Sequence, residues 1–353
     1  MAKSSLQPGR QAQRSGSGVP HISARCQEES RLRQGPHTGR EAGSGDTGVV
    51  LDHAVKVLAS APADGDYVAN GIWGVDLARK LATPEGREAH FLIDVRSRDA
   101  YGQGHIEGAV HMELAGCISA GNLERLPRGR KIVVVCDIGD VGPQVVSGLK
   151  LLGYDAAVLR TGMNGWVRNG FRDQVLADIS ASYPVENTPP DLIVPAQTGL
   201  PFTPPGDEDY PIIEREVKKA FASMPLEGDY AFNLIHPAAV NQQLEDALAE
   251  ERIFILDLRR EEDFEGVGHI RGAVQADFAA ALLPANLERL PRDRKIITVC
   301  YTGNTAGQLV LMLRMLGYDA AAMKYGMVGW KMTPTTFFYR KDLDKAGNPV
   351  VRS

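Results

Sequence analysis

Short apolar runs alternate with amphipathic stretches along most of the chain. Phe254–Leu258 and Ile296–Val299 are apolar at nearly every position, which is typical of strands buried on both faces of a parallel sheet. Ala239–Glu250 and Ala306–Leu316 instead carry apolar residues at helical spacing. Gly317 ends the second of these helices, and a further strand follows it. The alternation of strands and helices predicts a layered α/β fold.

The same pattern is written twice along the chain. Lys131–Val141 and Lys295–Thr305 each consist of an apolar run, a cysteine and a short loop. The other matching pairs are Ala59–Tyr67 with Ala222–Tyr230, Phe91–Arg96 with Phe254–Arg259, Gly104–Ala109 with Gly268–Ala273, Asn122–Pro127 with Asn286–Pro291, and Gly162–Trp166 with Gly326–Trp330. Solenoid units span roughly 20–50 residues, so a repeat this long predicts a duplicated domain.

Composition divides the chain into five segments. Residues 1–48 are rich in Arg, Gln, Gly and Ser with almost no aliphatic residues, which predicts a disordered tail; a targeting peptide is the alternative. The two domains are expected at 49–171 and 212–340, followed by a C-terminal tail at 341–353. Clustered prolines at 172–211 exclude regular helix or central strand, so this linker is expected to be extended and to wrap one domain.

The bulk numbers describe an ordinary soluble protein. Of 353 residues, 43% are hydrophobic and 24% charged, and the formal net charge of −5 gives no support to nucleic-acid binding. No apolar run approaches the roughly 18–20 residues of a membrane span. The four cysteines are too few for a disulfide framework, which favours a reducing compartment. We therefore expect a cytoplasmic protein, unless a misassigned start codon conceals an export signal.

The loop after Cys300 carries the most informative chemistry. Cys300 ends a buried strand, and ligands bind beyond the carboxyl ends of the strands in parallel sheets. Tyr301–Thr305 is a tight loop in which Gly303 supplies backbone freedom, and Asn304 or Thr305 is available as the N-cap of the following helix. The loop amides and the helix N-terminus form an anion cradle, which also lowers the pKa of a thiol. This arrangement suits a thiolate nucleophile that accepts an anionic substrate.

Four sequence motifs together resemble the rhodanese family of sulfurtransferases. They are Asp-Val-Arg, Gly-His-Ile-x-Gly-Ala, Cys-x-x-Gly-x-Thr after a strand, and Gly-Met-x-Gly-Trp, and they occur in this order from about residue 50 to 335, in two copies. The resemblance implies two α/β domains, each a parallel five-stranded sheet with helices on both faces. It also implies a catalytic cysteine that cycles through a persulfide, in a monomer with paired domains.

By this resemblance Cys300 is the nucleophile. Its thiolate would attack the outer sulfur of thiosulfate, expel sulfite, and pass the sulfur to a thiol or cyanide acceptor. The expected substrate-binding residues are the loop and one arginine: Tyr301, Thr302, Gly303, Asn304, Thr305 and Arg259. For Arg259 a structural ion pair is the equal alternative. Neither a cofactor nor a metal is implied.

Cys136 is the corresponding candidate in the first copy. Its loop places Asp137, Asp140 and Val141 where the family usually has basic or hydroxylic groups. Two nearby carboxylates would raise the pKa of the thiol and repel thiosulfate. We therefore expect the second domain to be the enzyme and the first to support it, with Cys136 as a weaker second site.

Other residues have a structural explanation beside a functional one. The histidines of the Gly-His-Ile turns, the aspartates at strand ends and the closing tryptophans are expected to serve the fold, whereas two further cations could attract the substrate. These residues are His105 and His269, Asp94 and Asp257, Trp166 and Trp330, and the cations Arg260 and Lys324. Cys117 could act as a resolving thiol, although a bystander role is favoured for it as for Cys26.

Three competing functions remain open. The chain could be a persulfide carrier that accepts one sulfur without sustained turnover. A phosphatase or arsenate reductase would need a Cys-x5-Arg loop, but Ala306 and Gly307 stand where an arginine would be required. Mercaptopyruvate could be the donor, although Tyr301 departs from the Cys-Gly-x-Gly-x-Thr loop that is usual in such enzymes.

Overall fold

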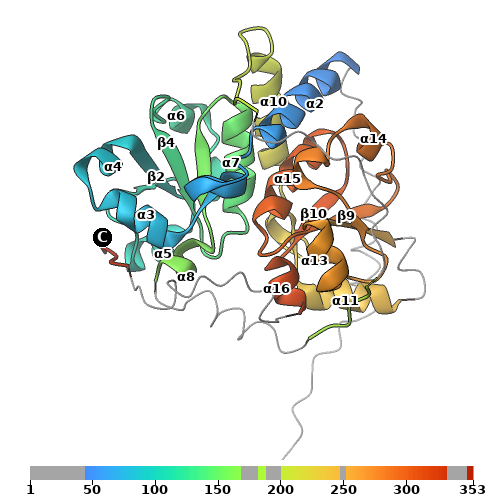
Figure 1. The fold of residues 1–353 in the computed structure, drawn as a ribbon. Helices are drawn as coiled ribbons and strands as arrows, with labels where there is room; N and C mark the ends of the chain where they lie inside the picture. Colours follow the sequence, from blue (N-terminus) through green and yellow to red (C-terminus); the bar gives the residue numbers. More distant parts are fainter. Residues whose placement is uncertain (1–43, 168–181, 188–199, 247–251, 332–347, 353) are drawn as a thin grey trace, which may run out of the picture. The chain divides into compact units, whose positions relative to one another are not determined.

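Two five-stranded sheets, one in each repeat, form the framework of the structure (Figure 1). The computed structural model describes residues 44–167, 182–187, 200–246, 252–331 and 348–352. The first sheet has the order β1 (Gly71–Ile72), β5 (Ala156–Leu159), β4 (Lys131–Val135), β2 (His90–Asp94) and β3 (Val110–His111). The second has the order β6 (Leu234–Ile235), β10 (Ala320–Met323), β9 (Lys295–Val299), β7 (Ile253–Asp257) and β8 (Val274–Gln275).

All strand pairs within the two sheets are parallel, which confirms the predicted fold class. The helices of the first repeat are α2 (Ser44–Ala59), η1 (Gly65–Asn70), α3 (Gly74–Leu81), α4 (Pro84–Ala89), α5 (Arg98–Gln103), η2 (Leu114–Gly116), α6 (Ala120–Leu123), α7 (Gly142–Leu151) and α8 (Gly162–Trp166). Those of the second are α10 (Tyr210–Ala222), η3 (Ala231–Asn233), α11 (Pro237–Glu245), α13 (Glu261–Gly266), η4 (Phe278–Ala280), α14 (Pro284–Leu287), α15 (Asn304–Met315) and α16 (Gly326–Trp330).

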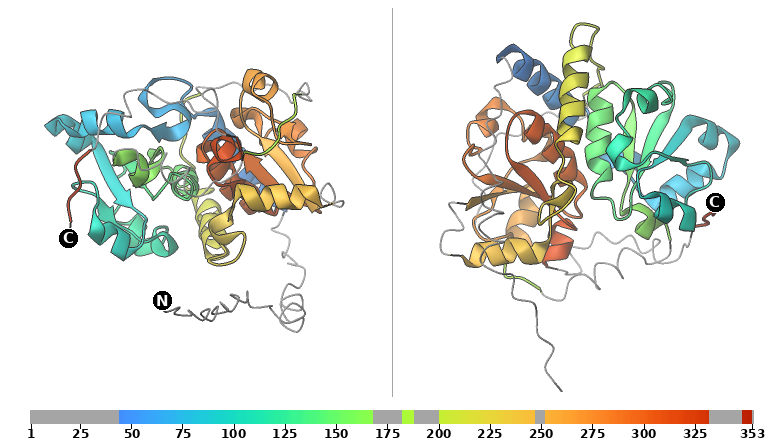
Figure 2. Two further views of the ribbon diagram at one scale, coloured as in Figure 1. Left: turned by 90° about the horizontal axis from the view of Figure 1, so that it is seen from below. Right: turned by 180° about the vertical axis from the view of Figure 1, so that it is seen from behind.

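Each sheet is covered on both faces, because successive side chains of a strand point to opposite sides. In β4, Ile132 and Val134 belong to a hydrophobic core shared by the two repeats, whereas Val133 and Val135 belong to a separate outer core. Ile296 and its neighbour Ile297 in β9 divide in the same way. In the shared core α7 packs against α15, and α2 and α10 pack against each other and against both (Figure 2).

The two repeats also hold each other by matching hydrogen bonds. Gln308 of α15 donates from Nε2 to Ala69 O at 2.8 Å, and its Oε1 accepts from Asn70 Nδ2 at 2.9 Å. Gln144 of α7 makes the same pair of bonds to Phe232–Asn233, at 2.8 and 2.9 Å. Both two-residue turns are left-handed, with φ between 49° and 59°. Each repeat therefore uses one glutamine to hold a turn of the other repeat. That turn has a left-handed backbone conformation, which residues other than glycine rarely adopt.

A segment of the linker docks on the second repeat. In residues 182–187, Glu186 exchanges two backbone hydrogen bonds of 2.9 Å with His269. Trp330, at the end of α16, donates from Nε1 to Pro184 O at 2.9 Å.

The C-terminal segment makes the same contacts on the first repeat. Val351 exchanges two backbone hydrogen bonds of 2.9 Å with His105, and Trp166 Nε1 donates to Pro349 O at 2.9 Å. The segment that follows one repeat thus completes the edge of the other.

Several element boundaries differ from those predicted. Helix α2 begins at Ser44, inside the expected tail 1–48; residues 1–43 lie outside the described part of the chain. Helix α10 begins at Tyr210, before the expected domain start at 212, because Pro211 is tolerated in a first helical turn. Helix α11 is described to Glu245, whereas a helix to Glu250 was predicted and residues 247–251 lie outside the described ranges.

Candidate functional site

Cys300 follows β9, the central strand of the second sheet. Its Sγ accepts a hydrogen bond from the Gly303 N–H at 3.1 Å, and the residue is only 2% exposed. Cys300 O in turn accepts from Met327 N–H at 2.8 Å. A Cβ atom at Gly326 would lie 2.3 Å from that same oxygen, so the start of α16 packs directly under the cysteine. The thiol is therefore held in one position from two sides.

Helix α15 begins directly after the loop. Gly303, with φ of 101°, occupies the N-cap, so the prediction of Asn304 or Thr305 as the cap was wrong. The reason is the turn itself, which needs the left-handed backbone conformation that glycine adopts without strain. The first N–H groups of the helix lack partners within the helix and lie beside the cysteine loop. This places partial positive charge near the thiol.

A cavity of about 490 Å³ lies over Cys300 and is lined by both repeats. The second repeat contributes the cysteine loop, Arg260 and Phe278. The first repeat contributes apolar side chains that include Leu58, Val68 and Trp73. A cavity of this size accommodates an organic molecule as well as a small anion.

One basic side chain of the first repeat reaches this cavity. Arg160 follows β5, and its Nε donates to Gly71 O at 3.2 Å while its Nη2 donates to Val68 O. The guanidinium lies 5.2 Å from the centre of the Trp73 ring. Burial lowers the pKa of Arg160 to about 10, and the negative charge of a Cys300 thiolate opposes that shift. Arg160 therefore stays charged at neutral pH.

Most of the predicted substrate-binding residues surround the cavity. Tyr301, Thr302, Asn304 and Thr305 line it, and the Gly303 N–H contacts the sulfur. The Tyr301 hydroxyl donates to Asp263 Oδ2, and burial raises its pKa above the ordinary value. The Tyr301 proton is thus committed to the Asp263 carboxylate.

Asn304 faces the other repeat. Its Nδ2 donates to Ala69 O at 3.3 Å, and its Oδ1 accepts from Gln308 Nε2 at 3.0 Å. The amide therefore joins the cysteine loop to the left-handed turn of the first repeat.

Arg259 does not lie among the residues that line the cavity. It is 1% exposed and its Nε and Nη2 bond the carboxylate of Asp257, while Nη2 also donates to Gly268 O at 2.9 Å. Arg96 makes the equivalent ion pair with Asp94 in the first repeat. This geometry favours the structural ion pair as the role of Arg259.

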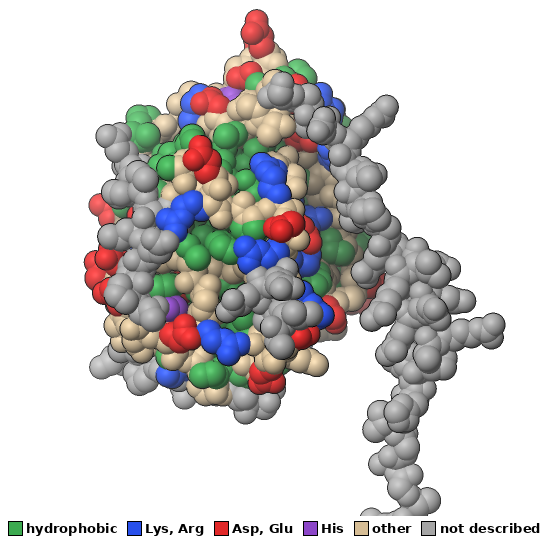
Figure 3. Space-filling view, turned by 90° about the vertical axis from the view of Figure 1, so that its right-hand side faces the viewer, with side chains coloured by type: hydrophobic (Ala, Val, Ile, Leu, Met, Phe, Trp, Pro, Cys, Tyr) green, Lys and Arg blue, Asp and Glu red, His purple; other side chains and the backbone are tan. Residues whose placement is uncertain are grey.

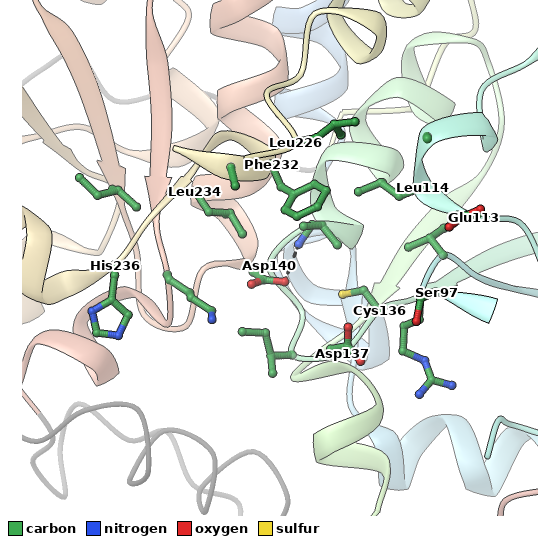
Figure 4. Close-up of a pocket in the computed structure, with 18 of the residues that line it drawn as sticks. Ser97, Glu113, Leu114, Cys136, Asp137, Asp140, Leu226, Phe232, Leu234 and His236 are labelled. Carbon is green, nitrogen blue, oxygen red and sulfur yellow. Dashed lines mark hydrogen bonds between the residues drawn. The ribbon is translucent and has the colours of Figure 1, made fainter. Parts of the chain in front are cut away.

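A second, larger cavity of about 810 Å³ lies over Cys136 (Figure 4). Cys136 Sγ accepts from Gly139 N–H at 3.2 Å, as Cys300 does from Gly303. On the far side stand residues of the second repeat, among them Phe232, Leu234 and His236. Lys324 also lines this cavity and is not among the residues that line the cavity of Cys300. Each cysteine therefore faces the other repeat.

The electrostatics of the first cavity oppose a thiolate. Burial and then the charge of Asp140 raise the pKa of Cys136 to about 12. Burial also raises the pKa of Asp140 to about 6, although the Val141 N–H and Lys324 act in the opposite direction. The pKa of Asp137 is likewise raised by burial. At neutral pH Cys136 is a protonated thiol.

The remaining candidates have structural contacts. Each histidine of the Gly-His-Ile turns bonds a backbone carbonyl through Nδ1 and stacks on an aromatic ring: His105 on Tyr101, and His269 on Phe264. Cys117 is buried and donates to Leu114 O at 3.2 Å. Cys26 lies outside the described residues.

Two features of the site were not predicted from sequence. These features are Arg160 and the pair Gln144 and Gln308. The alignment of the two repeats does cover them: Arg160 aligns with Lys324, and Gln144 aligns with Gln308. The alignment carries no signal, however, that each of these residues acts across the boundary between repeats.

The described part of the chain has no helix long and apolar enough to cross a membrane. Within the same described ranges, no group of three or more His, Cys, Asp or Glu side chains is arranged to hold a metal ion. The face in Figure 3 mixes acidic and basic side chains, with neither sign gathered into a single large patch.

The family model of the rhodanese-like domain matches the chain twice, at residues 76–169 and 240–333. These two matches cover more than half of the sequence, and the chain belongs to the rhodanese-like domain family. The resemblance predicted from the motifs is thereby confirmed. No curated protein matches the sequence closely enough to count as a relative.

Several solved structures are similar to parts of this chain. A rhodanese-related protein from Thermoplasma volcanium is 22% identical, with 28% of this chain and 89% of that chain covered and a TM-score of 0.25. A rhodanese-like domain protein from Staphylococcus aureus is 23% identical, with 29% and 93% covered and a TM-score of 0.25. A thiosulfate sulfurtransferase from Pseudomonas aeruginosa is 17% identical, with 83% and 48% covered and a TM-score of 0.28.

Proposed function

We propose that this protein is a sulfurtransferase that moves sulfane sulfur from thiosulfate, or a similar anionic donor, to a thiol or cyanide through a persulfide on Cys300. The observation that carries the proposal is the position of the Cys300 sulfur. Cys300 directly follows the central strand β9, its sulfur accepts the Gly303 N–H at 3.1 Å, and it lines a cavity beside the N-terminus of α15. Amide donors around a thiol stabilise its thiolate form, which is the nucleophile.

In the first half-reaction the Cys300 thiolate attacks the outer sulfur of thiosulfate. The new bond joins Sγ to that sulfur, and the sulfur–sulfur bond of thiosulfate breaks with its electron pair leaving on sulfite. The charge of the resulting Cys300 persulfide lies on its outer sulfur. The hydroxyls of Thr302 and Thr305 and the loop amides are the proposed donors to that sulfur.

In the second half-reaction the acceptor attacks the outer sulfur of the persulfide. Cyanide leaves as thiocyanate, or a thiolate leaves as a new persulfide, and the electron pair of the broken bond returns to Cys300. No net oxidation occurs over the cycle. The chain needs no redox cofactor for this reaction.

The same proposal assigns a supporting role to the first repeat. Cys136 has a pKa raised to about 12 and carries Asp137 and Asp140 beside it, which would repel an anionic donor. We therefore assign catalysis to Cys300 alone. The first repeat instead supplies one wall of the Cys300 cavity.

The test is release of thiocyanate from thiosulfate and cyanide by the wild type, Cys300→Ser and Cys136→Ser. Cys300→Ser should abolish turnover, whereas Cys136→Ser should retain most of it. Turnover that survives Cys300→Ser would refute the assignment. A wild type that gains about 32 Da, one sulfur per chain, without turning over would instead favour the persulfide carrier.

A further inference from the structure

A positively charged side chain of the first repeat, Arg160, lines the cavity that contains the Cys300 sulfur. Arg160 extends from the end of β5 into the cavity of the second repeat, past the carbonyls of Gly71 and Val68. Those two bonds occupy Nε and one hydrogen of Nη2. Among the described residues, no acceptor bonds Arg160 Nη1, so this nitrogen can donate to a ligand. A guanidinium held in this way has donors left for an anion.

Gly71 makes the arrangement possible. A Cβ atom at this position would lie 2.8 Å from Arg160 Nε and 2.8 Å from Asn304 Nδ2. The arginine of one repeat and the cysteine loop of the other therefore meet over a residue without a side chain. In the second repeat Leu234 occupies the aligned position and lines the cavity of Cys136. The aligned cation there, Lys324, lines that cavity together with Asp137 and Asp140, and its positive charge acts against the rise in the pKa of both carboxyls.

We propose that Arg160 binds the anionic group of the sulfur donor and of the departing sulfite, so that the Cys300 site is composed of both repeats. This inference rests on the proposed function, which requires an anionic substrate over Cys300. The planar guanidinium matches two oxygens of a sulfonate or sulfite group at once. Its partly enclosed position weakens screening by solvent, which strengthens the attraction. No described side chain of the second repeat that lines this cavity, other than Arg260, carries a positive charge.

The experiment measures binding rather than turnover. Sulfite and thiosulfate are titrated calorimetrically into full-length Cys300→Ser, alone and combined with Arg160→Gln, Arg160→Lys or Arg98→Met. Arg160→Gln keeps an amide that can bond the Gly71 and Val68 carbonyls but removes the charge. Its Kd for sulfite should rise roughly 10- to 100-fold, as for loss of a hydrogen bond to a charged group.

The two other variants separate charge, geometry and general effects. Arg160→Lys keeps the charge without the planar fork, and its Kd should rise several-fold. Arg98 is an exposed arginine of α5 that does not line the Cys300 cavity, so Arg98→Met should leave the Kd unchanged. Melting temperatures of all variants report whether the fold is intact.

A Kd within about twofold of the parent in a folded Arg160→Gln variant would overturn the inference. If that variant does not fold, an unchanged Kd in Arg160→Lys overturns it instead. The two proposals can fail separately. If anion binding depends on Arg160 but the wild type shows no sulfurtransferase turnover, the anion site formed by both repeats is supported and the proposed function is refuted. In an active enzyme, Arg160→Gln should raise the KM for thiosulfate while the reaction of the persulfide with cyanide stays fast.

Discussion

Asp140→Asn should stabilise the protein at neutral pH. Asp140 is 7% exposed, and burial raises its pKa from 3.8 to about 6. The folded state therefore holds a proton on this carboxyl at pH values where the unfolded chain has lost it. The contribution of Asp140 to the stability of the fold is most favourable below pH 3.8 and is lost as the pH rises through 6, because the charged carboxylate must then be kept in a buried site.

The size of the effect follows from the shift. Two pKa units correspond to about 3 kcal/mol at pH 7.5, at about 1.4 kcal/mol per unit. The second repeat shows how an amide fits here, since Asn304 stands at the aligned position and bonds a carbonyl and a glutamine of its surroundings. Phe232 O and Gln144 Nε2 are the equivalent partners for an asparagine at 140.

The assay is urea unfolding, followed by tryptophan fluorescence, of the wild type and Asp140→Asn at pH 7.5 and pH 4. We expect a gain of about 3 kcal/mol at pH 7.5 that nearly disappears at pH 4, where the wild-type carboxyl is protonated. Asp64→Asn at an exposed position should change stability by under about 0.5 kcal/mol. An Asp140→Asn variant that gains nothing at pH 7.5, or gains equally at both pH values, would refute the electrostatic reasoning.

Two further predictions concern the cysteine and glutamine pairs. Cys136, whose pKa is raised to about 12, should be alkylated by iodoacetamide at pH 8 about a thousandfold more slowly than a free thiol, with the rate rising about tenfold per pH unit; peptide mass spectrometry measures this, and a plateau below pH 9 would contradict it. Gln308→Ala and Gln144→Ala should each cost about 1–3 kcal/mol of stability in urea unfolding, because each leaves buried backbone and amide groups without partners. Only Gln308→Ala should also lower thiocyanate formation, and equal losses in both variants would show that the turn at Ala69–Asn70 does not serve the Cys300 cavity.

The sequence predicted what depends on local pattern. Continuous apolar runs identified the buried strands, and the repeated Cys-containing loop located the candidate nucleophile after β9. The cap of α15 was missed because Gly303 was weighed only as a flexible loop residue, whereas the turn needs its positive φ at the cap itself.

Contacts between distant residues were beyond such patterns. Arg259 looked available for an anion, but the carboxylate two positions earlier on the same strand end already binds it. Arg160 gave no sign of a functional position, since its role depends on how two repeats pack and on the missing side chain at Gly71. Packing between domains is set by tertiary contacts that no local spacing encodes.

The exchange of docking segments has a consequence for the order of folding during synthesis. Domains generally fold from the N-terminus as the chain emerges from the ribosome. The first repeat, however, receives its partner for His105 and Trp166 only from residues 348–352, which are translated after the second repeat. The second repeat, in contrast, finds residues 182–187 already synthesised when its own tryptophan emerges. The domain that is made first is thus the one completed last, and its final edge closes only after the second repeat has been synthesised.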